Sequence, residues 1–178
     1  MYLRVLERYL GQLDILLQKA VQHIEQSDSQ EQAILQSRLA EDMFAFHQQV
    51  STCVGFALRA AYPLYDLPIP PLKADTVSFN GLRALVRQGK DFLHALPDEA
   101  QGQPMEEDIW STAGFAERHF STEEYIHLYA LPNFFFHLGI VYALLRQAGV
   151  DLSKGDFDGF HVYPPGFRFE QQQASPSQ

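Results

Sequence analysis

Apolar positions recur every three or four residues along much of the chain, which is the period of a helix with one buried face. A stripe over residues 3–24 predicts a long amphipathic helix. A second stripe over residues 35–61 predicts another long helix. A weaker stripe over residues 82–96, preceded by the capping candidates Thr76 and Ser78, predicts a third. The first half of the sequence therefore indicates a helical protein.

Prolines and a loss of helical period divide the rest of the chain. Four prolines between residues 63 and 71 require an extended connection, because proline does not fit a helix interior. Residues 97–120 lack the helical period and predict a small hairpin or an irregular excursion. Ser121 and Glu124 have capping-box spacing and predict a short helix, and Pro132 is expected to begin the last helix, which should end at Gly149.

These elements predict an all-α fold, an up-down four-helix bundle with a long connection between the second and third helices and an excursion before the fourth. Residues 1–163 are expected to form one domain. Residues 164–178 are expected to form a flexible tail, because they carry too few apolar side chains to fold. The last helix is apolar on most sides, so either the excursion or a second subunit should cover its outer face.

Composition and charge exclude several kinds of partner. The 178 residues suit one domain, and the formal charge of −9 disfavours nucleic acid and anionic membrane surfaces, which attract a positive field. The single cysteine, Cys53, excludes an internal disulfide and favours the reducing cytoplasm. Polar residues, among them Asn133, His137 and Arg146, interrupt the best apolar segment, so we expect no membrane span.

Several short motifs along the chain resemble one known family. They are Arg38-Leu39, Asp42-Met43-Phe44, Leu131-Pro132-Asn133-Phe134-Phe135-Phe136-His137, Tyr142-Ala143-Leu144-Leu145-Arg146, Gly149-Val150, and Lys154-Gly155-Asp156-Phe157 with Gly159. Together they resemble an uncharacterised bacterial family of the DinB-like (DinB/YfiT) four-helix-bundle superfamily, over nearly the whole chain to about residue 160. The Pro-Asn-Phe-Phe-Phe-His string is the most specific of them.

The resemblance implies a four-helix bundle, commonly dimeric, in a superfamily many of whose members hold a divalent metal with three histidines. Some of these relatives are thiol-dependent transferases or hydrolases. One histidine comes from the second helix and two, four residues apart, from the last. His137 matches the second of that pair, Asn133 stands in place of the first, and His47 lies near the position on the second helix. An amide oxygen is a poor ligand for zinc, nickel or iron, so the metal triad is incomplete here.

Helical spacing places His47, Asn133 and His137 toward the interior, where Tyr142 is a further candidate for the lining of a cavity. Two interpretations of the histidines stay open at this point. They could be buried core histidines whose partners are a tyrosine or Gln49, or they could be metal ligands. Asn133 is better explained as a cap, or as a partner that fixes the tautomer of His137, than as a ligand.

Three functional hypotheses follow. The first is a cytoplasmic homodimer that binds a small molecule in an inter-helix cavity with a degenerate metal site. The second is a metal-dependent hydrolase or thiol transferase that uses His47 and His137 to bind zinc, nickel or iron. The third is a dimeric structural or interaction module without catalysis. The first is favoured, with no cofactor rather than a divalent metal, and Cys53 is better explained by inert packing than as a nucleophile.

Overall fold

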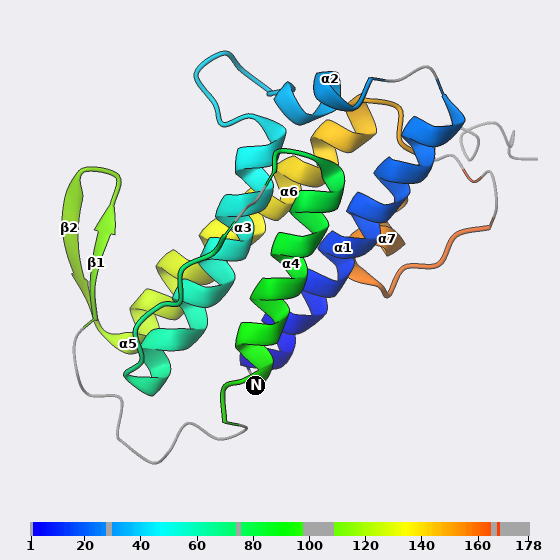
Figure 1. Cartoon of the computed structure of the whole chain (residues 1–178). Helices are drawn as coiled ribbons and strands as arrows, with labels where there is room; N and C mark the ends of the chain where they lie inside the picture. Colours follow the sequence, from blue (N-terminus) through cyan, green and yellow to red (C-terminus); the bar gives the residue numbers. More distant parts are fainter. Residues whose placement is uncertain (1, 28–29, 74–75, 98–108, 165–166, 168–178) are drawn as a thin grey trace, which may run out of the picture.

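The computed structural model describes residues 2–27, 30–73, 76–97, 109–164 and 167. Four long helices lie side by side, and shorter helices and one hairpin connect them or extend from them (Figure 1). The long helices are α1 (Tyr2–Gln26), α3 (Phe46–Ala61), α4 (Phe79–His94) and α6 (Leu131–Gln147). The shorter elements are α2 (Glu31–Gln36), η1 (Tyr62–Tyr65), β1 (Ile109–Ala113), β2 (Ala116–Phe120), α5 (Thr122–Glu124), η2 (Tyr125–Ala130) and α7 (Lys154–Asp158). Most of the predicted tail lies outside the described residues.

The core lies between the four long helices. Helix α3 packs against both α6 and α4, and α4 packs against α1. The predicted stripe of α1 is buried in this core, as are Phe46 of α3, Phe79 of α4 and Phe134 of α6. Ser78, one of the two predicted caps, begins α4, since its Oγ accepts a hydrogen bond from the N–H of Gly81 at 3.0 Å. The first and third predicted helices are confirmed.

The second predicted helix is interrupted, so the prediction of one helix over residues 35–61 is wrong. Helix α2 ends at Gln36, and Ser37 has an extended backbone (φ −63°, ψ 148°). The Ser37 hydroxyl donates to the carbonyl of Ile34 at 2.7 Å, a local bond that competes with the helical ladder. The chain then loops out until the N–H of Phe46 donates to the Ser37 carbonyl at 2.8 Å. Leu39, assigned to the buried stripe, lies in this loop and is 49% exposed.

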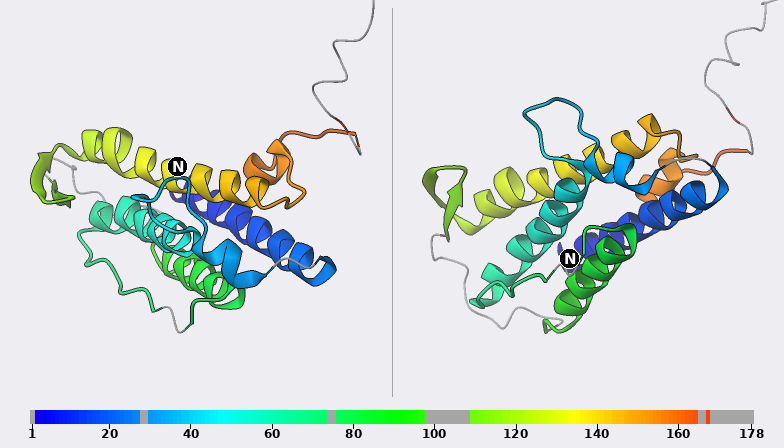
Figure 2. Two further views of the ribbon diagram at one scale, coloured as in Figure 1. Left: turned by 90° about the horizontal axis from the view of Figure 1, so that it is seen from above. Right: turned by 45° about the horizontal axis from the view of Figure 1, so that its top comes forward.

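The predicted hairpin is confirmed as the antiparallel pair β1 and β2, although residues 98–108 lie outside the described residues. Gly114, with φ +61°, occupies the first central position of the two-residue turn, where glycine is favoured. The Tyr129 hydroxyl donates to the Thr112 carbonyl at 3.2 Å, and Phe120 stacks on Tyr129. The hairpin therefore packs on η2. Figure 2 shows the hairpin and α7 at opposite ends of the helical stretch that α5, η2 and α6 form together.

The short helix predicted after Ser121 and the last helix, with Pro132 in its first turn as predicted, are both present, and a continuous helical stretch joins them. The Ser121 hydroxyl accepts from the N–H of Glu124, and the Glu124 carboxylate accepts from the N–H of Ser121, as predicted. Helices α5, η2 and α6 then continue without a break. Because η2 is a π-helix, its wider turn accommodates Pro132 without ending the helix. The stretch ends at Gly149 (φ +87°), as predicted.

By length and composition alone, the stretch Thr122–Gln147 could cross a membrane. This is a weak indication, because the core helix of a soluble protein can have the same length and composition. In the most apolar 18 residues of this stretch, 44% of the residues are buried inside the protein. Within the described residues α6 packs against α3 and α1, as a core helix does. The fold is therefore mostly helical, with a small two-stranded sheet.

Candidate functional site around His137

Helices α3 and α6 bring Cys53 against Phe134 in the core. Cys53 is fully buried, and its thiol points at the Phe134 carbonyl with Sγ and O 3.6 Å apart. Burial raises the pKa of the Cys53 thiol, because a thiolate would lose its hydration there. The thiolate is the nucleophilic form of cysteine. Cys53 is therefore a packed thiol at neutral pH, as the sequence favoured.

One turn away, the same two helices pair Gln49 with His137. Both side chains are buried, with Gln49 1% and His137 7% exposed. Gln49 Oε1 lies 2.6 Å from His137 Nδ1, and Gln49 Nε2 donates to the Phe44 carbonyl at 3.2 Å. Since a carbonyl can only accept, it fixes the orientation of the amide, so Oε1 faces the ring and Nδ1 carries the hydrogen. The other ring nitrogen, Nε2, then presents a lone pair.

Two further observations define the state of His137. Burial lowers the pKa of its imidazole, so the ring is neutral at pH 7. No hydrogen bond joins Nε2 to any described residue, and no buried side-chain nitrogen or oxygen in the described part of the chain lacks a partner. Nε2 must therefore retain contact with solvent. His137 is a mostly buried ring with one acceptor nitrogen open to the outside.

Three phenylalanines surround the imidazole. The rings of Phe56 and Phe44 lie nearly parallel to it, with centroids 5.6 and 6.3 Å away, and Phe136 presents a perpendicular ring at 5.2 Å. Phe56 is buried, whereas Phe44 is 49% and Phe136 56% exposed. Two of the three rings that contact the imidazole therefore reach the surface.

Asn133 lies one helical turn before His137 and is half-buried. Its Nδ2 donates to the carbonyl of Tyr129 at 2.7 Å, where η2 passes into α6. The side chain therefore satisfies a backbone acceptor, rather than the backbone donors that a residue at a helix start would cap. The second Nδ2 hydrogen and the amide oxygen form no hydrogen bond with a described residue, so Asn133 keeps one donor and one acceptor.

The structure does not join the other sequence-predicted residues to His137. His47 is half-buried, and within the described residues no hydrogen bond or ring contact links it to His137, whose partner is Gln49. The Tyr142 ring lies against Phe157 of α7, with ring centroids 5.8 Å apart. In the described part of the chain, no three His, Cys, Asp or Glu side chains lie close enough together to hold a metal ion.

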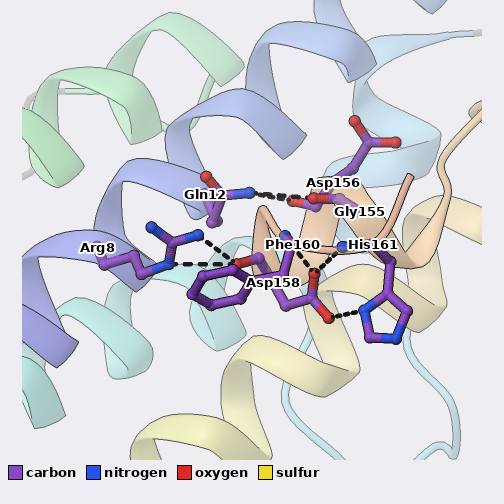
Figure 3. Close-up of polar contacts among 7 residues, drawn as sticks. All are labelled: Arg8, Gln12, Gly155, Asp156, Asp158, Phe160 and His161. Atoms are coloured by element: carbon purple, nitrogen blue, oxygen red, sulfur yellow. Dashed lines mark hydrogen bonds and ion pairs between the residues drawn. The ribbon is translucent and has the colours of Figure 1, made fainter.

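A second polar cluster attaches the C-terminal segment to α1 (Figure 3). The Arg8 guanidinium donates to the Asp158 carbonyl at 3.0 and 3.3 Å and lies 3.8 Å from the centre of the Phe160 ring. The Gln12 amide donates to the carbonyls of Gly155 and Asp156. These contacts use the backbone carbonyls of the Lys-Gly-Asp-Phe-Asp-Gly motif.

The two carboxylates of the motif have different partners, Asp158 within its own segment and Asp156 on α1. Asp158 accepts from the N–H groups of Phe160 and His161 and pairs with the His161 ring, and these bonds lower the pKa of Asp158 to about 2. Asp156 forms an ion pair with Lys19 at 2.7 Å. This ion pair ties the segment to α1, whereas Lys154 of the same motif is exposed. The cluster is a structural attachment.

Comparisons with known proteins give two findings. A family model described as "Domain of unknown function (DUF1993)" matches residues 1–158. A solved structure described as a DinB family member protein from Shewanella denitrificans is similar, with a TM-score of 0.80 and 22% identity, covering 91% of this chain and 92% of that chain. At that identity the likeness shows the fold alone. Among curated proteins there is no match.

Proposed function

The chain belongs to the DUF1993 family of domains of unknown function, and we propose that it is a DinB-like four-helix bundle that binds a small molecule at His137. The observation that carries the proposal is the open Nε2 of a buried, neutral imidazole. A purely structural core histidine would have both ring nitrogens satisfied by the protein. Here Gln49 fixes only Nδ1, and Nε2 keeps its lone pair free of any described residue.

The surroundings of Nε2 support a small organic ligand. Ligand sites combine apolar and aromatic walls with a few placed polar groups. The rings of Phe44, Phe56 and Phe136 supply such walls, and His137 supplies the polar group. We do not extend the proposal to metal-dependent hydrolysis or thiol transfer through His47 and His137. A catalytic zinc needs three protein ligands, and the described residues contain no such cluster.

Phenol tests this proposal, because it combines an aromatic ring with one hydrogen-bond donor. Titration into isotope-labelled protein is expected to shift the backbone amide signals of Phe136 and His137 in a saturable way. A dissociation constant of about 1 mM, equivalent to about −4 kcal/mol, suits so small a ligand. In His137→Phe, which keeps a ring but lacks the acceptor, the saturable shift is expected to be lost. No shift in the wild type, or an equal shift in the variant, would contradict the proposal.

The outer side of the last helical stretch favours a second proposal, that the protein is a homodimer. Leu128 is 71% and Phe136 56% exposed, and Pro132 between them is exposed as well. No Asp, Glu, Lys or Arg occurs between Glu124 and Arg146. An uncharged face is complementary to its own copy, as an isologous two-fold interface requires. The hairpin covers η2 and leaves this side open.

Light scattering during size exclusion tests the dimer. The wild type is expected at twice the monomer mass, and Phe136→Glu, which buries a charge in the interface, is expected at the monomer mass. Trp110→Glu is the matched control, because Trp110 is also an exposed aromatic residue, at 70%, but lies on β1. It should leave the mass unchanged. A wild type that stays monomeric at high concentration would remove the proposal.

A further inference from the structure

Phe136 belongs both to the proposed binding site and to the proposed dimer face. Its ring stands edge-on to the imidazole of His137, with ring centroids 5.2 Å apart and an angle of 81° between the planes. The same side chain is 56% exposed, and it follows Leu128 and Pro132 at a spacing of four residues on the outer side of the helical stretch. A molecule bound against His137 and a second copy bound against this side would therefore both contact Phe136.

The protein holds the Phe136 ring on one side only. Among the described residues, His137 is the one ring that it contacts. Phe134, two residues earlier in α6, is fully buried by comparison. An exposed side chain changes rotamer rapidly, and fixing it in one rotamer costs conformational entropy. In a monomer, a ligand that packs on Phe136 must overcome that cost by itself.

The other two rings around His137 do not have this double position. Phe56 is buried in α3 and is already fixed. Phe44 is 49% exposed, but it lies in the loop before α3, and its carbonyl is held by the Gln49 amide at 3.2 Å. Phe136 is therefore the ring through which a partner on the outer side of the helical stretch can act on the site.

We infer that the partner subunit completes the binding site: dimerisation fixes the Phe136 ring against His137, so the dimer binds the small molecule more tightly than the monomer does. The two events share the entropy cost of one side chain, which makes the coupling positive. Because such coupling is reciprocal, the ligand also tightens the dimer. This inference rests on the proposed function, because it states how the pairing of two copies regulates the site at His137.

Leu128→Lys makes a monomer for the first test while leaving the rings around His137 unchanged. Leu128 is 71% exposed and lies eight residues before Phe136, so the lysine is solvated in the monomer but buried in the dimer. Phenol is titrated into the labelled wild type and variant, and the amide signal of His137 is followed. Phenol is expected to bind the wild type at least about five-fold more tightly than the variant, the lower end of the usual coupling between two sites.

The reverse measurement uses the wild type and does not depend on a variant. The dissociation constant of the dimer is measured by light scattering over a dilution series, without phenol and with phenol well above its own dissociation constant. A five-fold gain at each of the two sites of the dimer should tighten the dimer by about 25-fold. Trp110→Glu is the control, because Trp110 is 70% exposed on β1. It should change neither the dimer nor the affinity for phenol.

The outcomes separate this inference from the two proposals on which it builds. Equal affinity for phenol in the Leu128→Lys monomer and the wild type, or a dimer that phenol leaves unchanged, overturns the coupling, while the binding site and the dimer both stand. A dimer that phenol weakens also overturns it, because the partner would then compete for Phe136. If Leu128→Lys remains dimeric, the measurement on the wild type decides. A wild type that stays monomeric, or that shows no saturable shift with phenol, overturns the inference together with the proposal concerned.

Discussion

Phe134→Ala is expected to lower the free energy of unfolding by about 3–5 kcal/mol, the usual cost of removing a buried phenylalanine ring. Phe134 is fully buried in α6, with its ring against that of Phe135 and its carbonyl against the Cys53 thiol. Alanine would leave a cavity where α3 and α6 pack together. Urea denaturation followed by circular dichroism measures the change.

Phe115→Ala is the matched control for this substitution. Phe115 is the same residue type but stands fully exposed at the tip of the hairpin. Its replacement should leave the free energy of unfolding nearly unchanged, since exposed side chains away from packing contacts contribute little. Equal effects of the two substitutions would mean that α3 and α6 do not pack as the structure describes.

Gln49→Leu is expected to lower the free energy of unfolding by about 1–3 kcal/mol, the cost of leaving a buried donor unsatisfied. The His137 Nδ1 hydrogen and the Phe44 carbonyl would both lose their partner. The ring of His137 should then lose its fixed tautomer. Nitrogen-15 spectra of the histidine rings measure this, since protonated and unprotonated ring nitrogens have well separated signals.

The double variant Gln49→Leu with His137→Phe provides the control for that effect. With both polar partners replaced, no buried donor is left without an acceptor, so the combined cost should be smaller than the sum of the two single costs. Additive costs would show that the Gln49 to His137 hydrogen bond does not couple the two residues.

The periodic part of the fold could be predicted from the sequence, and the interruptions could not. The stripe of Leu6, Leu10 and Leu13 predicted α1 because helix burial follows directly from spacing. At the break, the Ser37 hydroxyl and N–H both bond to the Ile34 carbonyl, a local arrangement that the spacing of apolar residues does not reveal. The passage through Pro132 depends on a π-helical segment, whose spacing differs only slightly from that of an α-helix.

The candidate site shows the same division. Asn133 and His137 were identifiable as polar residues in an apolar segment, and Gln49 was one of two partners considered for the histidines. Gln49 and His137 are 88 residues apart, so nothing local in the sequence specifies their hydrogen bond. Phe44 could not be placed beside the imidazole, because its position depends on the loop that replaces the predicted helix.

The nitrogen-15 spectrum of the His137 ring in the unliganded wild type at pH 7 tests the central claim most directly. The account predicts a neutral ring with the hydrogen on Nδ1 and the lone pair on Nε2. It also predicts that the ring stays neutral as the pH falls to about 6.5, where an ordinary histidine is half protonated, because burial lowers its pKa. Below that pH the unfolded chain takes up a proton that the folded protein does not, so stability should fall. A hydrogen on Nε2, or a protonated ring at pH 7, would contradict the acceptor site at His137.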